Sequence, residues 1–240
     1  MNQAVLFDCD GVLVDSEDGL SKIAAYVLNN FYNLPAIPDD FIPFIGTGED
    51  IYIGEVVRKH SGLYIQEMKS KIYNEYIHSA KKYVDPIKGA RDLIVNLRNL
   101  GYKVAVASSA DLPKVEVNLQ ILGLDHCDFD AVITGSDVEK KKPAPDIYLA
   151  ASKRCNVLPA NCIVIEDATS GVLSGKKAGM AVVGFTSSVS EALLKSSGAD
   201  YTVSTMDELG ILLTELNLKF STVNSNIEAV HIDEVINELS

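Results

Sequence analysis

The chain has 240 residues, of which 47% are hydrophobic and 22% charged, and its formal net charge is −12. This composition is typical of a globular protein large enough for one domain with a smaller insert. The negative charge disfavours a nucleic-acid-binding surface, which needs clustered Lys and Arg, and no apolar run approaches the ~20 residues that span a bilayer.

The first predicted element is a strand at residues 3–8, which is apolar on both faces and therefore expected in the middle of a parallel sheet. It runs into Asp8-Cys9-Asp10-Gly11. Alternation along an extended backbone would place Asp8 and Asp10 on one side and Cys9 on the other. Two carboxylates on one side repel each other, so we expect a bound cation or acid–base chemistry there. The alternative is an acidic turn that simply leaves the core.

Residues 16–83 are predicted to be helical throughout, because apolar side chains recur at helical spacing in three segments. Pro35, Pro38 and Pro43 interrupt the first loop of this stretch. We expect a helical insert at 16–83 and a core formed by 1–15 and 84–240, joined by hinges at 11–17 and 79–86.

From residue 84 onward, predicted strands alternate with predicted helices. The helices are expected at 90–100, 112–122, 145–155, 171–178, 189–196 and 206–216, and the strands at 102–107, 131–134, 162–165, 181–185 and 201–203. This alternation predicts an α/β fold with a Rossmann-like parallel sheet covered by helices on both faces. Apolar residues within the polar stretch 219–240 suggest one last strand or helix.

Polar residues follow several predicted strands at their carboxyl ends, where open parallel sheets bind ligands. Ser108, Lys142 and the pair Glu166-Asp167 follow later strands as Asp8 follows the first. Each has an ordinary structural interpretation, such as a helix N-cap for Ser108 or a solvated charge for Lys142. Together, the carboxylates suit Mg²⁺, and the hydroxyl and ammonium groups suit a phosphate bound beside it.

The four cysteines have no C-x-x-C spacing and form no zinc-site pattern with histidine, so we expect free thiols in a reducing compartment. They are Cys9, Cys127, Cys155 and Cys162. Residues 1–20 contain Asp8, Asp10 and Asp15, which makes this stretch a poor signal peptide. We expect a cytoplasmic monomer, or an organellar one if a transit peptide has been removed.

Four segments resemble, in order and spacing, the four motifs of the haloacid dehalogenase superfamily. They are Asp8-Cys9-Asp10-Gly11-Val12-Leu13-Val14-Asp15-Ser16-Glu17, then Val104–Ser108, then Lys142-Pro143-Ala144-Pro145-Asp146, and finally Ile165-Glu166-Asp167 with Ser170-Gly171 and Ala178-Gly179 behind it. The resemblance covers essentially the whole chain. A helical insert directly after the first motif resembles the cap domain of the β-phosphoglucomutase-like subgroup.

The resemblance implies a mechanism in which Asp8 is the nucleophile and forms an aspartyl-phosphate. Asp10 would be the general acid toward the leaving oxygen and then the general base toward water. Mg²⁺ would lie between Asp8, the backbone carbonyl of Asp10 and Asp167, with Glu166 in support. No organic cofactor is expected.

The resemblance also implies how phosphate is bound. Ser108 and Lys142 would hold the phosphoryl oxygens in the transition state. Ser109, Cys9 and Asp10 complete the predicted phosphate-binding set, although alternation turns the Cys9 side chain toward the core.

Two departures from the family pattern favour a phosphatase over a mutase. β-Phosphoglucomutases have a histidine after the first motif and an arginine in a loop of the cap, whereas Asp18-Gly19-Leu20 and Gly46-Thr47-Gly48-Glu49-Asp50 contain neither. A mutase must hold a second phosphate, which Glu49 and Asp50 would repel. We therefore expect a phosphatase acting on a small sugar or polyol phosphate, with a mutase as the alternative and a non-catalytic binding module as the third possibility.

Overall fold

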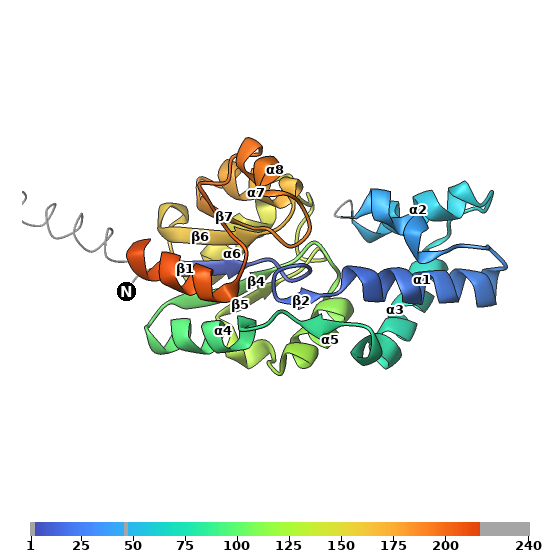
Figure 1. Ribbon diagram of the computed structural model, residues 1–240, viewed down its shortest axis with the longest axis horizontal. Coiled ribbons are helices and arrows are strands. Elements are labelled where there is room, and N and C mark those ends of the chain that lie inside the picture. The colour runs from blue at the N-terminus through green and yellow to red at the C-terminus, as the bar shows by residue number, and fades with distance from the viewer. Residues whose placement is uncertain (1–2, 46–47, 217–240) are drawn as a thin grey trace, which may run out of the picture.

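The computed structural model describes residues 3–45 and 48–216. Its centre is a sheet of six parallel strands in the order β5-β4-β1-β6-β7-β8 (Figure 1). The strands are β1 (Ala4–Phe7), β4 (Lys103–Ala107), β5 (Ala131–Ile133), β6 (Cys162–Glu166), β7 (Ala181–Phe185) and β8 (Tyr201–Val203). The predicted α/β fold with a parallel sheet is confirmed.

The first strand lies in the middle of the sheet, as its apolar sequence predicts. All four residues of β1 are buried, and Phe7 is level with Val106 of β4 on one side and Ile165 of β6 on the other. This register aligns the carboxyl ends of three strands. It therefore brings Asp8, Ser108 and Glu166 to one edge of the sheet.

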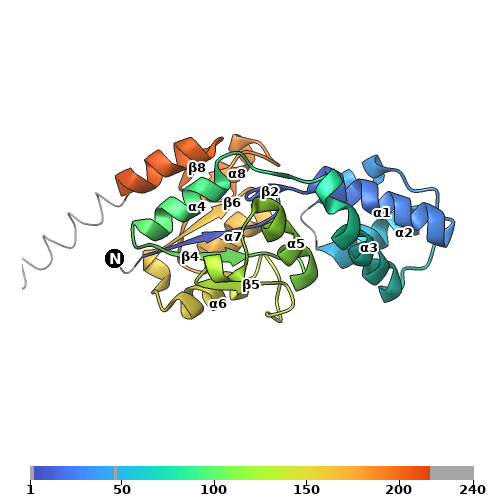
Figure 2. The same cartoon turned by 90° about the horizontal axis from the view of Figure 1, so that it is seen from below.

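Helices cover both faces of the sheet, because successive residues of each strand point to opposite sides. Val5 and Phe7 pack in one core with α4 (Ala90–Asn99), α5 (Leu112–Leu122) and the helix at 206–216. Ala4 and Leu6 pack in a second core with α6 (Asp146–Cys155), α7 (Thr169–Lys177) and α8 (Glu191–Ser196). The helix at 206–216 lies beside α4 (Figure 2).

The described residues from 16 to 83 contain helices and no strand, as predicted. The helices are α1 (Glu17–Tyr32), η1 (Pro38–Phe44), α2 (Glu49–Lys59), α3 (Gln66–Ser79) and η2 (Ala80–Lys82). They gather beyond one end of the sheet (Figures 1 and 2). Apolar residues of α1, α2 and α3 pack on one another, among them Val27, Val56 and Ile72.

Two short strands that the sequence analysis did not predict join this helical insert to the core. They are β2 (Val14–Asp15) and β3 (Asp85–Pro86), which pair antiparallel with Val14 opposite Pro86. The amide of Ile87 also donates to the carbonyl of Leu13 at 2.9 Å. The chain therefore enters and leaves the insert through one two-stranded ribbon.

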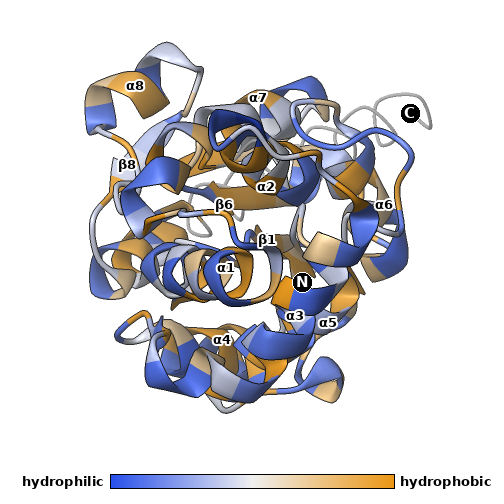
Figure 3. Cartoon of the chain, turned by 90° about the vertical axis from the view of Figure 1, so that its right-hand side faces the viewer, coloured by the Kyte–Doolittle hydropathy of each residue, from blue (hydrophilic) through white to orange (hydrophobic). Residues whose placement is uncertain are grey.

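Hydrophobic residues concentrate on the central strands, and the outer turns and helix faces are more hydrophilic (Figure 3). Among the described residues, no helix combines the length and apolar character needed to cross a membrane. Residues 219–240, for which a further strand or helix was expected, lie outside the described part of the chain.

Candidate active site

A cavity of about 310 Å³ lies between the carboxyl edge of the sheet and the helical insert. Its walls include most of the residues that the sequence predicted for the site. Those lining it are Asp8, Asp10, Ser108, Ser109, Lys142, Glu166 and Asp167. The separate strand ends therefore meet in one place, as predicted from their positions after the strands.

Lys142 connects two of the carboxylates. Its ammonium group donates to Asp8 Oδ1, to Glu166 Oε1 at 2.6 Å and to the carbonyl of Ala107 at 2.9 Å. The Lys142 side chain is only 5% exposed, so it is not a solvated surface charge. These contacts raise its pKa despite burial, and the group stays a cation.

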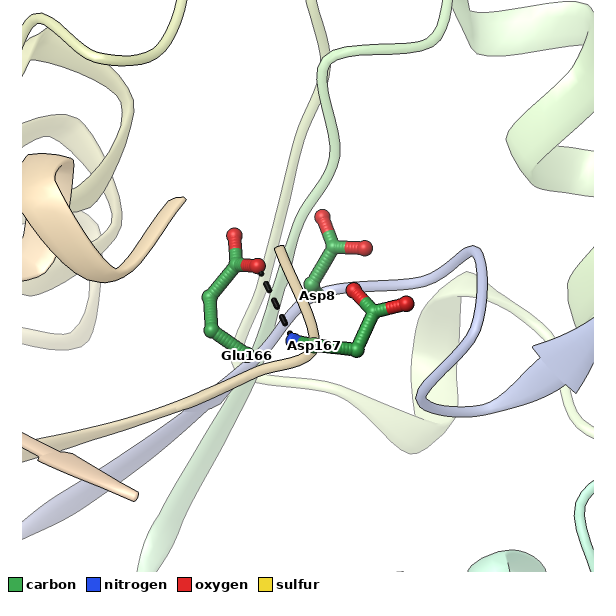
Figure 4. A group of neighbouring side chains, drawn as sticks. All are labelled: Asp8, Glu166 and Asp167. Atoms are coloured by element: carbon green, nitrogen blue, oxygen red, sulfur yellow. Dashed lines mark hydrogen bonds between the residues drawn. The ribbon is translucent and has the colours of Figure 1, made fainter. Parts of the chain in front are cut away.

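Three carboxylates form a buried cluster at the strand ends (Figure 4). One oxygen each of Asp8, Glu166 and Asp167 lies within 4.8 Å of the others. Burial, followed by the nearby charges of Glu166 and Asp10, raises the pKa of Asp8 to about 7 although Lys142 opposes this. Burial and the charges of Glu166 and Asp8 raise the pKa of Asp167 well above its usual value. Lys142 alone therefore does not offset the cost of ionising all three carboxyl groups.

The Glu166 carboxylate is held by four donors. Besides Lys142, the Tyr148 hydroxyl donates to Oε1 at 2.7 Å. The amides of Asp167 and Ala168 donate to Oε2 at 3.1 and 3.2 Å. Tyr148 is fully buried on α6. Because these donors engage both of its oxygens, the Glu166 carboxylate is held in one orientation.

Two glycines leave room for the acidic side chains. A Cβ at Gly171 would lie 1.7 Å from Glu166 Oε1, and a Cβ at Gly11 would lie 1.8 Å from Asp167 Oδ2. Gly11 also has φ of +75°, which favours glycine. The hydroxyls of Ser187 and Ser188 bind this region, the first donating to the carbonyl of Gly11 at 2.6 Å and the second to Asp167. Any larger residue at either glycine would displace a carboxylate.

Asp10 also lines the cavity, but its carboxylate lies outside the cluster of three. Its Oδ1 accepts from the ammonium of Lys114 at 2.8 Å, from Asn118 Nδ2 at 3.0 Å and from the Ser16 hydroxyl. Burial alone would raise the pKa of Asp10, but these partners, led by Lys114, lower it. In this arrangement Asp10 is a carboxylate with three donors.

The sequence analysis missed Lys114, Asn118 and Tyr148. A signal for the first two exists: they are four residues apart on α5, so they share one helix face. Both are buried beside apolar neighbours. The Tyr76 hydroxyl of α3 donates to Asn118 Oδ1 at 2.7 Å and so links the insert to this face.

The remaining predicted residues lie in and beside the cavity. Ser108 is buried, and its hydroxyl accepts from the amide of Ala110 at 3.1 Å. It is not the N-cap of α5, because that position is Asp111. Ser109 lines the cavity, whereas the Cys9 side chain is fully buried in the core behind it. A phosphate could meet Cys9 only through its backbone.

Comparison with known proteins identifies relatives along most of the chain. A model of the family described as haloacid dehalogenase-like hydrolase matches residues 5–185. The Arabidopsis thaliana protein named "Protein SUPPRESSOR OF QUENCHING 1, chloroplastic" is 42% identical over 202 residues, which are 81% of this chain and 19% of that protein. The Bacillus mycoides pyrophosphatase PpaX is 26% identical, covering 89% of this chain and 97% of its own length.

A solved structure of similar fold is that of β-phosphoglucomutase from Clostridium difficile. It superposes with a TM-score of 0.75 at 23% identity and covers 93% of this chain and 100% of its own. At this coverage the similarity extends over both the sheet and the helical insert of this chain.

Proposed function

Because the chain belongs to the haloacid dehalogenase-like hydrolases and its fold is similar to that of a β-phosphoglucomutase, we propose the reaction that it catalyses. It is a phosphoric monoester hydrolase that depends on Mg²⁺ and releases phosphate from a small sugar or polyol phosphate through an aspartyl-phosphate. The observation that carries this proposal is the arrangement of Asp8. It stands at the end of β1, paired with Lys142 and within 4.8 Å of two further buried carboxylates.

The donor set suits Mg²⁺. Asp8, Glu166 and Asp167 supply hard oxygen ligands, and a cation among them would offset the mutual repulsion that helps to raise the pKa of Asp8 and Asp167. We propose that Asp8, Asp167 and the backbone carbonyl of Asp10 hold the metal, with Glu166 supporting it. When bound, the ion neutralises the carboxylates and the phosphate, so that two anions can approach each other.

Asp8 is proposed as the nucleophile and Asp10 as the proton carrier. An Asp8 oxygen bonds to phosphorus while the bond from phosphorus to the leaving oxygen breaks. For this step Asp10 first takes up a proton, as substrate binding changes its contacts with Lys114, Asn118 and Ser16, and then gives that proton to the leaving oxygen. Asp10 then takes a proton from a water molecule. The resulting hydroxide attacks phosphorus, the bond to Asp8 breaks, and inorganic phosphate leaves.

Ser108 and Lys142 are proposed to bind the phosphoryl oxygens. Both line the cavity, and Lys142 already lies against Asp8. Their hydroxyl and ammonium groups would stabilise negative charge as it shifts during transfer. Ser109, which lines the cavity, and the backbone of Cys9 and Asp10 complete the proposed phosphate site.

We propose that residues 16–83 act as a cap domain on a core of residues 1–15 and 84–240. The ribbon of β2 and β3 carries both connections, so it is suited to serve as the hinge. Closure would exclude bulk water from the aspartyl-phosphate. Crystal forms with and without a phosphate analogue that superpose with no rigid-body rotation of the insert would argue against this.

A mutase is the alternative, given the structural similarity to β-phosphoglucomutase. Incubation with β-glucose 1-phosphate and a bisphosphate primer separates the two activities. Phosphate release faster than glucose 6-phosphate formation supports the phosphatase, and the reverse order supports the mutase. The cytoplasmic or organellar location and the monomeric state stay predictions, and one relative is named as chloroplastic.

The direct test is hydrolysis of p-nitrophenyl phosphate with Mg²⁺ and with EDTA. We expect hydrolysis that requires the metal and that Asp8→Asn abolishes, and a ³²P label from substrate on Asp8 after acid quench. A folded wild-type protein with no more activity than Asp8→Asn would instead support the non-catalytic binding module.

A further inference from the structure

The wall of the cavity farthest from the strand ends is built by the helical insert. Its lining residues are Glu17, Leu20, Phe44, Ile45, Gly48, Glu49 and Tyr52. A phosphoryl group bound among the strand-end residues would direct its leaving group toward this wall. The wall combines apolar side chains with two carboxylates, and those carboxylates bear on which leaving groups fit.

Glu49 is the more deeply buried of these two carboxylates. It is the first residue of α2 and is only 6% exposed. Its Oε2 is buried and accepts no hydrogen bond within the described part of the chain. The ammonium of Lys114 lies 3.8 Å from the other oxygen, which is too far for a hydrogen bond. Buried polar atoms are normally paired, so this oxygen lacks an expected donor.

The positively charged side chains that line the cavity already form ion pairs with its carboxylates. Among the described residues that line it, the cations are Lys114 and Lys142. Lys142 pairs with Asp8 and Glu166, and Lys114 pairs with Asp10. Neither is free to bind a second anionic group of a substrate without giving up a buried partner.

We propose that Glu49 is a specificity-determining residue whose carboxylate accepts a hydrogen bond from the leaving group of the substrate. The donor is a hydroxyl or an ammonium group, and a small rotation of the Glu49 side chain brings Oε2 to the cavity that the residue lines. A leaving group with a carboxylate or a second phosphate is rejected, since it would face Glu49 and Glu17 with no free cation. This inference rests on the proposed phosphatase function and adds the chemical class of its substrate.

A matched series of two-carbon phosphate monoesters tests this selectivity. Phosphoethanolamine ends in an ammonium group, 2-hydroxyethyl phosphate in a hydroxyl and 2-phosphoglycolate in a carboxylate, with the same reacting end. For the wild-type enzyme with Mg²⁺, we expect kcat/KM on the first two to exceed that on the third by about tenfold or more. Comparing the first two shows whether the donor is an ammonium or a hydroxyl.

Two substitutions assign the selectivity to Glu49. The quantity compared is the kcat/KM for phosphoethanolamine or 2-hydroxyethyl phosphate divided by the kcat/KM for 2-phosphoglycolate. Glu49→Gln should lower this ratio to about a third of its wild-type value or less, and Glu49→Arg should reverse the preference so that the ratio falls below one. Asp50→Asn is the control, because it removes the same charge from the next residue, which is exposed and outside the cavity. Its ratio should equal that of wild type.

Three outcomes are distinguishable. Wild-type preference for 2-phosphoglycolate overturns the inference without any variant, even if a variant does not fold. An unchanged ratio in folded Glu49→Gln overturns the role of Glu49. Absence of hydrolysis of p-nitrophenyl phosphate by wild type contradicts the phosphatase proposal itself, which is a separate result.

Discussion

The substitution Gly171→Ala should disable the site through one methyl group. Gly171 lies in the first turn of α7, where alanine is otherwise the better helix former by about 1 kcal/mol. Its Cβ would lie 1.7 Å from Glu166 Oε1 and 2.2 Å from Oε2, whereas ordinary contacts begin at 3.4 Å. The carboxylate has to leave its place.

The size of the effect follows from the partners that Glu166 would lose. Lys142, Tyr148 and two backbone amides donate to it at 2.6 to 3.2 Å, all in a buried setting. Separating a buried charged pair costs about 3–5 kcal/mol. After the gain of about 1 kcal/mol in helix propensity, we expect a net loss of about 2–4 kcal/mol. Displacement of Lys142 by about 1 Å should lower kcat about 100-fold.

The assay combines urea unfolding with phosphatase kinetics, and Gly54→Ala is the matched control. Gly54 is inside α2, and its Cβ would meet Tyr64 at 3.6 Å, an ordinary contact. That variant should keep its activity and gain up to about 1 kcal/mol. In a Glu166→Ala background, where the clash is absent, Gly171→Ala should no longer destabilise the protein and should gain up to about 1 kcal/mol. If Gly171→Ala behaves like Gly54→Ala in the wild-type background, the reasoning from the carboxylate is refuted.

Three further predictions concern the metal, the insert and the support of Glu166. Because the pKa of Asp8 is raised from 3.8 to about 7, the metal-free folded protein holds a proton that the unfolded chain releases, and stability falls as pH rises through this window. The rise in Tm on adding Mg²⁺ should therefore be larger at pH 8 than at pH 5.5 in differential scanning fluorimetry, and an equal rise would contradict the cluster as the metal site. In the insert, burial would raise the pKa of Asp40, but bonds from Lys59, Ile37 and His60 lower it to about 2. This stabilisation is present above pH 3.8 and lost as pH falls toward 2, so Asp40→Asn should cost about 1–3 kcal/mol at pH 7 and little at pH 2 in urea unfolding. Finally, Tyr148→Phe removes one donor to Glu166 and should cost about 1–2 kcal/mol with a several-fold fall in kcat; unchanged kinetics would show that this bond does not position the site.

The sheet and its site edge could be predicted because they depend on local patterns. Apolar runs bounded by polar residues define β1, β4 and β6. Once strands alternate with helices, the parallel arrangement places all their carboxyl ends together. Residues that directly follow a strand, such as Asp8 and Ser108, are therefore located by sequence position alone.

Residues that reach the site from helices could not be predicted in the same way. Lys114 and Tyr148 take their positions from the rotation of α5 and α6 against the sheet, which depends on packing across the core. The same limit applies to Glu49, since its place on the cavity wall depends on how the insert sits over the core. The strands β2 and β3 are two residues long and include a proline, so they have no pattern to detect.

The alternation argument for Asp8 and Asp10 held only in part, for a geometric reason. The strand ends at Phe7, and the next residues form a tight loop in which the amide of Gly11 donates to the carbonyl of Val14 at 2.8 Å. Strict alternation does not apply beyond the last extended residue. Both carboxylates reach the cavity, but Asp8 joins the acidic cluster whereas Asp10 joins Lys114 and Asn118.

This separation gives two neighbouring carboxylates different charge environments, as two different tasks require. Asp8 lies among acids, where a cation can offset its charge, while Asp10 is held by donors from both parts of the molecule. Ser16 starts the insert, and Tyr76 of α3 reaches Asp10 through Asn118. A displacement of the insert therefore changes the hydrogen bonds around Asp10, whereas the side chains that donate to the acidic cluster, Lys142, Tyr148 and Ser188, all belong to the core. The residue proposed to move protons is thus the one whose surroundings depend on the position of the insert, which links proton transfer to the part of the chain that contacts the leaving group.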